Sequence, residues 1–308
     1  MTVRHWAFLR WTATVAMVAL VIWLVDPAQV VDELQGVALP WLFLALAITP
    51  LQVALSAWRW CFTVRRLGGR LPLGHAVREY YLATLLNQLL PGGVAGDAGR
   101  ALRHRHRAGN TTLAVHGVMI ERFSGQVVLL LVSVPLAAVW LPRPPMPGLF
   151  LIPGLLVGGL LLWSLLQAPV VKRWWQRFRT DLAQALLSRL ALPLQLLSSL
   201  LVICTYLLVF WCLAMGLVLG IAVQQPWLLV ALCTVLLLAM VIPFTVAGWG
   251  VREGAAAVIW QLAGLDPGQG VALSVSYGLL VLVSSLPGVL FLFNAPRSPG
   301  QTAYRCPD

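Results

Sequence analysis

Two short segments of this chain combine glycine, proline and arginine in a way that could bind an anion. The first reads Asn-Gln-Leu-Leu-Pro-Gly-Gly-Val-Ala-Gly-Asp-Ala-Gly-Arg at residues 87–100, and the second reads Pro-Phe-Thr-Val-Ala-Gly-Trp-Gly-Val-Arg-Glu-Gly at residues 243–254. Proline removes a backbone donor and glycine weakens a helix, so each segment should interrupt a helix and leave N–H groups open to a ligand. Helix N-termini attract anions, and an arginine follows each interruption. The pattern predicts a seat for a lipid phosphate, and the alternative is a capped loop with an ordinary surface arginine.

The two segments also resemble each other, at an offset of 152 residues. Aligned from their prolines, they share five of eleven positions, which are Pro91/Pro243, Val94/Val246, Ala95/Ala247, Gly96/Gly248 and Arg100/Arg252. Paired interruptions in corresponding halves of a chain often mark the binding site of a transporter. This favours an internal repeat with halves 1–150 and 151–294, against chance similarity of two Gly/Ala-rich turns. Counting crossings places both segments on one side, so the repeat is parallel or one segment is re-entrant.

Two pairs of adjacent charges complete the candidate chemistry. Glu121-Arg122 lies early in a long apolar stretch, where an ionisable residue indicates function, and Arg252-Glu253 lies in the second broken segment. Neighbours in a helix do not face each other, so each member should have a different partner. We expect an acid of one pair to meet an arginine of the other, and the alternative is that both pairs lie at the membrane interface. Asp97 precedes Arg100 by three residues and could cap its helix.

The candidate lipid-binding residues are therefore Asn87, Pro91, Gly92, Gly93, Gly96, Asp97, Arg100, Glu121, Arg122, Gly248, Gly250, Arg252 and Glu253. No catalytic residue, metal site or cofactor is predicted, since the chain has no nucleotide loop, no zinc spacing and no CxxC pair.

The composition indicates the kind of protein in which these residues must be positioned. The chain has 308 residues, of which 60% are hydrophobic and 10% charged, against roughly 45–50% and 25% in soluble domains. These values exclude a disordered chain, a nucleic-acid-binding domain and an ordinary cytosolic enzyme, and they indicate a membrane protein. The net charge of +11 is concentrated in a few loops between apolar stretches, which is typical of a surface facing anionic lipid.

Seven stretches have the length of a membrane-spanning helix, which needs about 20 mostly apolar residues. They are Trp6–Val25, Leu39–Phe62, Leu113–Leu141, Leu149–Gln167, Pro193–Gly220, Trp227–Ala247 and Val271–Asn294. Basic residues alternate between rich loops (63–112 and 168–192) and poor ones (26–38 and 221–226). The positive-inside rule then predicts a cytoplasmic N-terminus in the inner membrane of a bacterium. Residues 248–270 either dip into the membrane, giving seven crossings, or complete an eighth.

Three further segments are predicted at the inner surface. Ala76–Leu90 is amphipathic and should lie on the inner leaflet or dip into it, and Lys172–Arg189, with its interfacial tryptophans Trp174 and Trp175, is amphipathic too. The alternating run Arg103-His104-Arg105-His106-Arg107 suits a loop facing lipid headgroups, since its arginines repel a metal ion. His116 is isolated and supports no inference.

The motifs together resemble the flippase-like family typified by the transmembrane part of bacterial lysylphosphatidylglycerol synthases. The family pattern reads approximately Asn-x-x-x-Pro-Gly-Gly-x-Gly-Gly-Asp-x-x-Arg, then Glu-Arg, then Gly-x-Gly-x-Arg-Glu, and this chain departs from it at Ala95 and Ala247. The resemblance extends from about Trp6 to Asn294, which predicts one all-α transmembrane domain over residues 1–294 with a tail at 295–308. It implies movement of a polar lipid between leaflets. The chain ends at Asp308, so we expect no synthase activity here.

Three functions remain open on this reading. The first is a lipid translocase without enzymatic activity whose substrate is an anionic, aminoacylated or isoprenoid-type lipid, held by Arg100 and Arg252. The second is a non-catalytic scaffold whose partner is a separate lipid-synthesising enzyme. The third is a membrane-embedded enzyme that modifies a lipid with Glu121, Glu253 and His116. Membrane lipids are the expected partners and nucleic acid is not, while the oligomeric state stays open.

Overall fold

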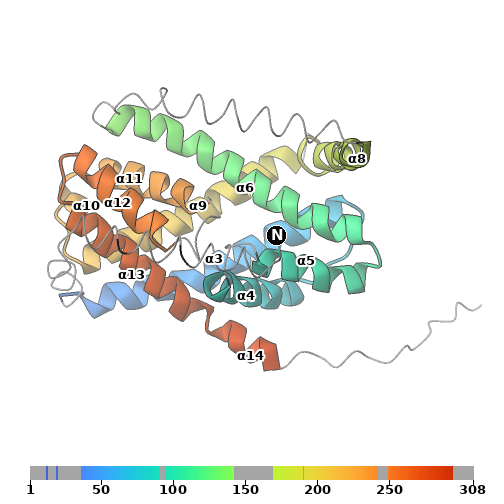
Figure 1. Cartoon of the computed structure of the whole chain (residues 1–308), viewed down its shortest axis with the longest axis horizontal. Coiled ribbons are helices and arrows are strands. Elements are labelled where there is room, and N and C mark those ends of the chain that lie inside the picture. The colour runs from blue at the N-terminus through green and yellow to red at the C-terminus, as the bar shows by residue number, and fades with distance from the viewer. Residues whose placement is uncertain are drawn as a thin grey trace, which may run out of the picture.

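The computed structural model describes residues 36–90, 95–141, 169–189, 191–241 and 249–293, together with Thr12 and Ala19. Within these ranges the chain forms helices and turns (Figure 1). The all-α, multi-pass fold is therefore confirmed. The predicted span Leu149–Gln167 lies outside the described residues, and so does Trp6–Val25 apart from the helical Thr12 and Ala19.

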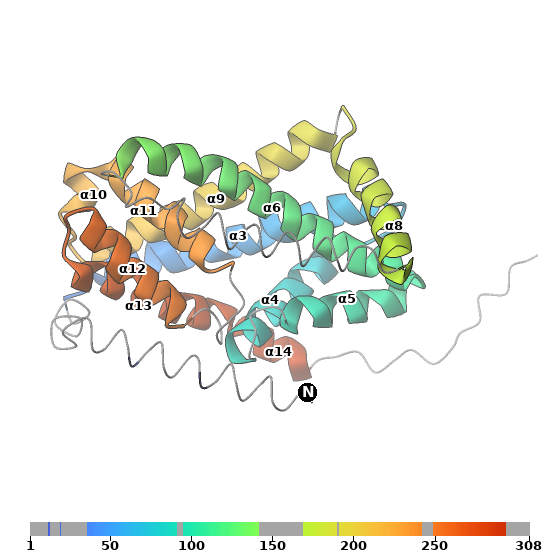
Figure 2. The ribbon, with the colours of Figure 1, turned by 45° about the horizontal axis from the view of Figure 1, so that its top comes forward.

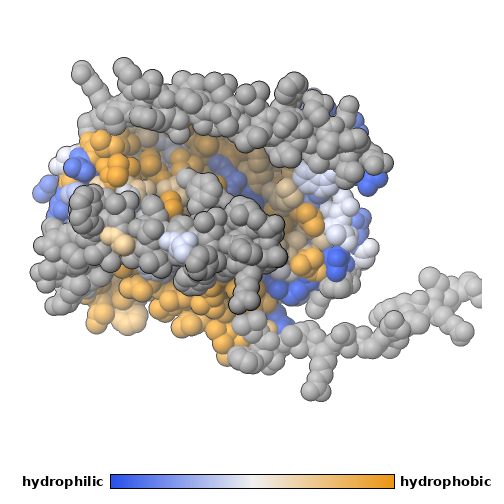
Figure 3. Space-filling model, in the orientation of Figure 1, coloured by the Kyte–Doolittle hydropathy of each residue, from blue (hydrophilic) through white to orange (hydrophobic). Residues whose placement is uncertain are grey.

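Four helical stretches are long and apolar enough to cross a membrane. They are α3 (Leu39–Arg66), α6 (Thr111–Trp140), α9 (Ala191–Gly216) and the stretch Pro267–Phe291, which comprises α13 (Pro267–Ser285) and most of α14 (Pro287–Phe293). Four of the seven predicted spans are confirmed by these helices. Figure 3 shows hydrophobic side chains over much of the visible described surface, as expected of helices that face lipid.

Helices α3 and α9 form the centre of the structure and run antiparallel along their whole length. The N–H of Ala38, before α3, donates to the carbonyl of Gly216 at the end of α9 (2.8 Å). Further along, Gln195 donates to the Thr63 hydroxyl (2.8 Å), and Arg66 donates to Ser188 (2.7 Å). The structure thus has two ends. We call the end with Arg66 and Ser188 the arginine end, and the end with Gly216 and α10 (Ile221–Gln224) the α10 end.

Basic residues separate sharply between the two ends. The segments that meet at the arginine end carry Arg65, Arg66, Arg70, Arg103, Arg105, Arg177, Arg179 and Arg189. The described segments of the α10 end (36–41, 216–228 and 262–270) contain no arginine or lysine. This separation is the one that the positive-inside rule expects across a membrane.

A broken helical hairpin starts from the arginine end. It consists of α4 (Leu73–Leu89) and α5 (Ala95–Ala108), which are antiparallel because Asn87 meets Gly96 near the break and Glu79 meets Arg103 near the open end. The 14 residues of α5 span only about 21 Å, less than the roughly 30 Å of a bilayer core. The hairpin therefore enters and returns to the same end. That α4 lies on the inner leaflet or dips into it stays a prediction.

A second broken hairpin starts from the α10 end, where the sequence predicted one continuous span. Helix α11 begins at Pro226 and ends at Ala239 after 14 residues, before the interruption predicted at 243–254, so the described helix is shorter than the predicted span Trp227–Ala247. Helix α12 (Val251–Leu262) then leads to α13, to which it is antiparallel, since Arg252 meets Ser274 and Trp260 packs against Gly270. Figure 2 shows α10, the end of α12 and the start of α13 together at one side of the molecule.

The two hairpins make corresponding contacts with their neighbours. The contacts of α3 with α4 and α6 recur between α9 and helices α11 and α13, and those between α5 and α6 recur between α12 and α13. Likewise, α6 packs on α11 as α13 packs on α4. Because α3 and α9 are antiparallel, the corresponding contacts of the two hairpins run in opposite directions. Of the two alternatives left by the count of crossings, a parallel repeat or a re-entrant segment, the short α11 favours the re-entrant segment.

Close approach of α4 and α5 depends on a glycine. A Cβ at Gly96 would fall on the backbone carbonyl of Ala83. We expect Gly96→Ala to force α5 away from α4 and to lower the free energy of unfolding by about 1–3 kcal/mol. Thermal unfolding of the protein in detergent measures this. Gly74→Ala is the matched control, since a Cβ there meets nothing within 4 Å, and it should leave stability unchanged or slightly higher. Equal midpoints for both variants would contradict the close packing.

Candidate functional site

A buried carboxylate organises the charges on the arginine side of the structure. Glu121 of α6 is fully buried and accepts hydrogen bonds from Arg59 of α3, through Nε (3.1 Å) and Nη2, and from Nη2 of Arg100 on α5 (2.8 Å). Arg59 donates its remaining Nη1 to the hydroxyl of Ser199 on α9 (3.1 Å). One carboxylate therefore joins three helices through two buried guanidinium groups.

Arg100 is fully buried and only partly satisfied. Its Nε lies 2.9 Å from a carboxylate oxygen of Asp97, and its guanidinium lies over the rings of Trp60 (4.8 Å) and Tyr80 (4.4 Å). Its Nη1 has no hydrogen-bond partner among the residues that the structure describes. Since buried donors are nearly always satisfied, this N–H is available to an acceptor that enters the site.

A second acid extends the cluster towards the surface. Asp97 accepts a hydrogen bond from Arg122 (2.8 Å), whose side chain is 43% exposed. Asn87 of α4 accepts from the N–H of Gly96 (2.7 Å) and donates to Asp97 (3.5 Å), so it holds the start of α5 against α4. We call Arg59, Asp97, Arg100, Glu121 and Arg122 the arginine cluster. With three cations and two anions, it has one positive charge in excess.

Glycines make room for these large side chains. Gly117 and Gly125 lie one turn before and one turn after Glu121, on the face of α6 that packs against α3. A Cβ at Gly125 would lie 2.9 Å from Nη1 of Arg59, and one at Gly117 would lie 3.1 Å from Val64. Along α3, Arg59 precedes Arg66 by seven residues, so it lies about 10 Å inside the arginine end.

A smaller cluster lies near the α10 end. Arg252 donates to Glu253 through Nε (3.0 Å) and Nη2 (2.6 Å), and also to the hydroxyl of Ser274 on α13 (2.8 Å). Glu253 in turn accepts from the N–H of Gly250 (2.7 Å), which caps α12. We call Arg252, Glu253 and Ser274 the serine cluster. Both charged residues are buried.

The predicted pairings are confirmed in part. Glu121 and Arg122 do have different partners. Arg252 and Glu253, however, bind each other, because the Glu253 side chain folds back over the first turn of α12 and leaves its second oxygen within reach of Arg252. The expected pairing between the two groups is also wrong, since each group binds residues of its own half of the chain.

The structure brings together most of the predicted site residues, but not in one place. Asn87, Gly96, Asp97, Arg100, Glu121 and Arg122 meet at the arginine cluster, whereas Gly250, Arg252 and Glu253 meet at the serine cluster. Pro91, Gly92, Gly93 and Gly248 lie outside the described residues. Asp97 lies in the first turn of α5, but it interacts with Arg100, Arg122 and Asn87, and it is Asn87 that accepts the hydrogen bond from the N–H of Gly96.

Sequence reasoning missed Arg59, although the signal was present. Arg59 lies inside the apolar span predicted at Leu39–Phe62, where an ionisable residue indicates a functional site by the same rule that selected Glu121. Tyr80 and Trp60 were missed as well, because their spacing carries no signal for a contact with an arginine on another helix.

One prediction about histidines is wrong, and a second histidine has a role that the sequence did not indicate. The run 103–107 lies within helix α5 rather than in a loop, and His104 is fully buried against Trp60 instead of facing headgroups. His116 is fully buried too, and its Nδ1 lies 2.6 Å from Asp181 of α8 (Pro169–Leu186). This contact, with edge-on stacking against Trp174 and Phe178, attaches the amphipathic α8 to α6.

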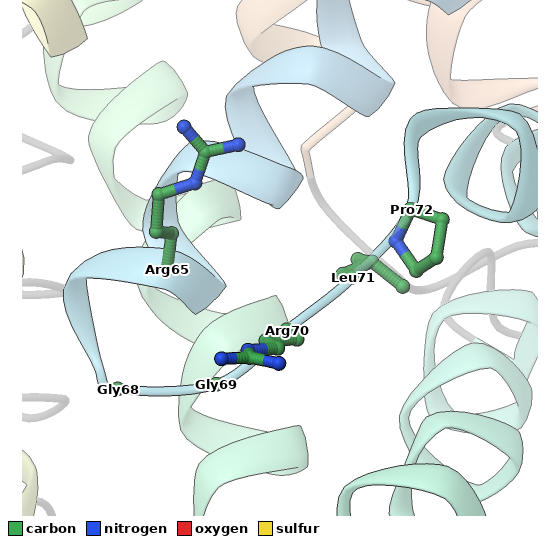
Figure 4. Close-up of a pocket in the computed structure, with 6 residues that line it drawn as sticks. All are labelled: Arg65, Gly68, Gly69, Arg70, Leu71 and Pro72. Carbon is green, nitrogen blue, oxygen red and sulfur yellow. The ribbon is translucent and has the colours of Figure 1, made fainter.

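A separate pocket lies on the surface of the arginine end. Figure 4 shows it at the turn between α3 and α4, with the guanidinium group of Arg70 beside Gly69 and the side chain of Arg65 pointing away from the turn. Both arginines are exposed, and neither belongs to the arginine cluster. They provide comparison positions of the same side-chain type outside the buried site.

Comparison with known proteins gives one match. The model of a family described as "Lysylphosphatidylglycerol synthase TM region" matches residues 11–288. No curated protein and no solved structure matches the chain.

The central role of Glu121 predicts a large effect on stability. Glu121→Gln leaves Arg59 buried without a carboxylate partner and Arg100 with Asp97 alone, which should lower the free energy of unfolding by about 3–5 kcal/mol. Replacing Arg59 by Met in the same chain removes one of the stranded charges and should restore part of the loss. Thermal or denaturant unfolding in detergent measures both variants, with the exposed Arg179→Gln as control. A Glu121→Gln protein as stable as the wild type would show that the arginines do not depend on this carboxylate.

Proposed function

The chain belongs to the family of lysylphosphatidylglycerol synthase transmembrane regions, and from this premise we propose that it moves a polar lipid between the two leaflets of its membrane. The family and the long apolar helices make it a multi-pass membrane protein related to lipid metabolism or transport. The proposal adds the activity, the headgroup chemistry and the residues that carry them.

The observation that carries the proposal is the unsatisfied donor of Arg100 in a buried cluster with excess positive charge. Charged groups at membrane depth are costly, and their usual partners are other charges or a substrate. A phosphate oxygen would supply both the missing acceptor for Nη1 and the missing negative charge. A lipid with a singly charged phosphodiester would leave the occupied cluster neutral.

The exposure of the cluster members supports a route into the site. Arg122 is 43% exposed while Arg100 and Glu121 are fully buried, so a headgroup would meet Arg122 first and Arg100 afterwards. Asp97 and Glu121 compete with the phosphate for the same guanidinium groups. This competition would keep binding weak enough for release, which a transporter needs.

The charge distribution supports an orientation. The arginine end would face the cytoplasm of a bacterial inner membrane, where its exposed arginines would meet anionic headgroups. The arginine cluster would then receive lipid from the cytoplasmic leaflet. A separate lipid-synthesising enzyme could supply this substrate, and the chain itself would perform no chemistry on it.

The proposal predicts a loss of transport when Arg100 is changed. In proteoliposomes containing fluorescent phosphatidylglycerol, Arg100→Gln should slow translocation by at least about tenfold, because one charge-assisted hydrogen bond contributes about 1.5–3 kcal/mol. Bleaching of the outer-leaflet probe with dithionite measures the rate. Arg100→Lys should be impaired too, since lysine keeps the charge but loses the planar set of donors.

Two controls make this experiment decisive. Arg70→Gln removes an exposed arginine of the same end and should transport lipid like the wild type. Size-exclusion profiles and unfolding midpoints establish that the Arg100 variants are folded. A folded Arg100→Gln protein that moves lipid at the wild-type rate would exclude the assignment of the site, and a wild-type protein that moves no lipid would exclude the function.

A further inference from the structure

The transport function proposed above does not use the serine cluster. The cost of burying its two charges suggests that it has a function of its own. Arg252 and Glu253 are both buried, at 1% and 4% exposure. A buried ion pair is often no more stable than an apolar pair of the same size, so stability alone does not explain it. Glu253 by itself already caps α12 through the N–H of Gly250. Capping therefore explains why Glu253 is buried there, but it does not explain the buried guanidinium of Arg252.

The serine cluster shares part of its chemistry with the arginine cluster, although its one cation and one anion leave no excess charge. Each cluster contains an arginine from the start of the second helix of a broken hairpin, bound to a carboxylate. Each binds a buried serine hydroxyl, Ser199 in one case and Ser274 in the other.

The surroundings of the two arginines correspond as well. Arg100 lies over Trp60 and Tyr80, and Arg252 lies over Trp249 (5.1 Å) and Tyr277 (5.5 Å). A glycine of the facing helix makes room for a guanidinium in both halves. On α6 Gly125 faces Arg59, and on α13 a Cβ at Gly278 would fall on Nη2 of Arg252.

The two clusters lie at similar depths from opposite ends. Ser274 comes seven residues after Pro267, the first residue of α13, and therefore lies about 10 Å inside the α10 end. Arg59 lies about 10 Å inside the arginine end, as described above. The opposite directions of the two hairpins thus place one cluster near each membrane surface.

The ring beneath Arg252 packs against α9. Tyr277 of α13 lies 5.5 Å from the guanidinium of Arg252 and stacks on Phe210 of α9, with 4.3 Å between the ring centroids.

We propose that the serine cluster is a second seat for the lipid phosphate, reached from the α10 end, so that the protein holds one headgroup site for each leaflet. This inference rests on the function proposed above. In the described conformation both clusters are buried, and alternating exposure of the two sites would follow from movement of the two broken hairpins.

The matched serines give a direct test of sidedness. In a cysteine-free background, Ser199→Cys and Ser274→Cys each place one thiol beside the arginine of its cluster with little change in volume. A membrane-impermeant methanethiosulfonate reagent should modify Ser199→Cys only from the arginine end and Ser274→Cys only from the α10 end. Phosphatidylglycerol in the vesicles should slow both reactions at least several-fold relative to phosphatidylcholine alone. Trp249→Cys is a second reporter for the serine cluster if Ser274→Cys does not fold.

The outcomes separate this inference from the function on which it rests. Modification of both thiols from the same end would overturn it, and so would serine-cluster thiols that never react while Ser199→Cys does. Modification of Ser274→Cys at a rate independent of phosphatidylglycerol would also overturn it, because the cluster would then hold no phosphate. If the labelling is as expected but the wild-type protein moves no lipid, the second seat stands and the transport function fails.

Discussion

The structure depends on the charge balance around Glu121. An apolar helical bundle that buries arginines must neutralise them, because an unpaired ion in such surroundings costs several kcal/mol. Glu121 does this for Arg59 and Arg100 together, and it thereby joins α3, α5 and α6. The glycines around it follow from the same constraint, since only a residue without a side chain leaves space for a guanidinium between closely packed helices. The arginine cluster keeps one excess positive charge, which an anionic headgroup would neutralise.

The breaks in the two hairpins place Arg100 of α5 and Arg252 of α12 inside the bundle and not at its surface. A helix that crossed the membrane without interruption would bring its first turn, with its free N–H groups, to the surface. Because α5 and α12 begin inside the bundle instead, their first turns and the arginines there lie within it. The antiparallel pair α3 and α9 relates the two hairpins, so that one opens towards each end. The broken hairpins therefore determine both the fold and the depth at which Arg100 and Arg252 lie.

Much of this could be read from the sequence, and the remainder has physical reasons. The long spans follow from apolar length, the breaks from proline and glycine, and the importance of Glu121 from an acid inside a span. The break at 243–254 was predicted from its proline and glycines, but the earlier end of α11 at Ala239 was not, because the residues there are as apolar as those of a true span. The pair Arg252–Glu253 contradicts the neighbour rule because that rule holds for helix interiors and fails in a first turn, where a side chain can fold back over the end. Contacts such as Arg100 with Tyr80 depend on helix packing, which no spacing in the sequence encodes.

The central claim is that Arg100 keeps a buried donor for a lipid phosphate. An experimental structure of the protein with a short-chain phosphatidylglycerol tests it most directly. We expect phosphate density within hydrogen-bond distance of Arg100 Nη1, between Tyr80 and Arg122. Density for the lipid elsewhere, with a protein group or an ordered water bound to that nitrogen in the presence of saturating lipid, would contradict it.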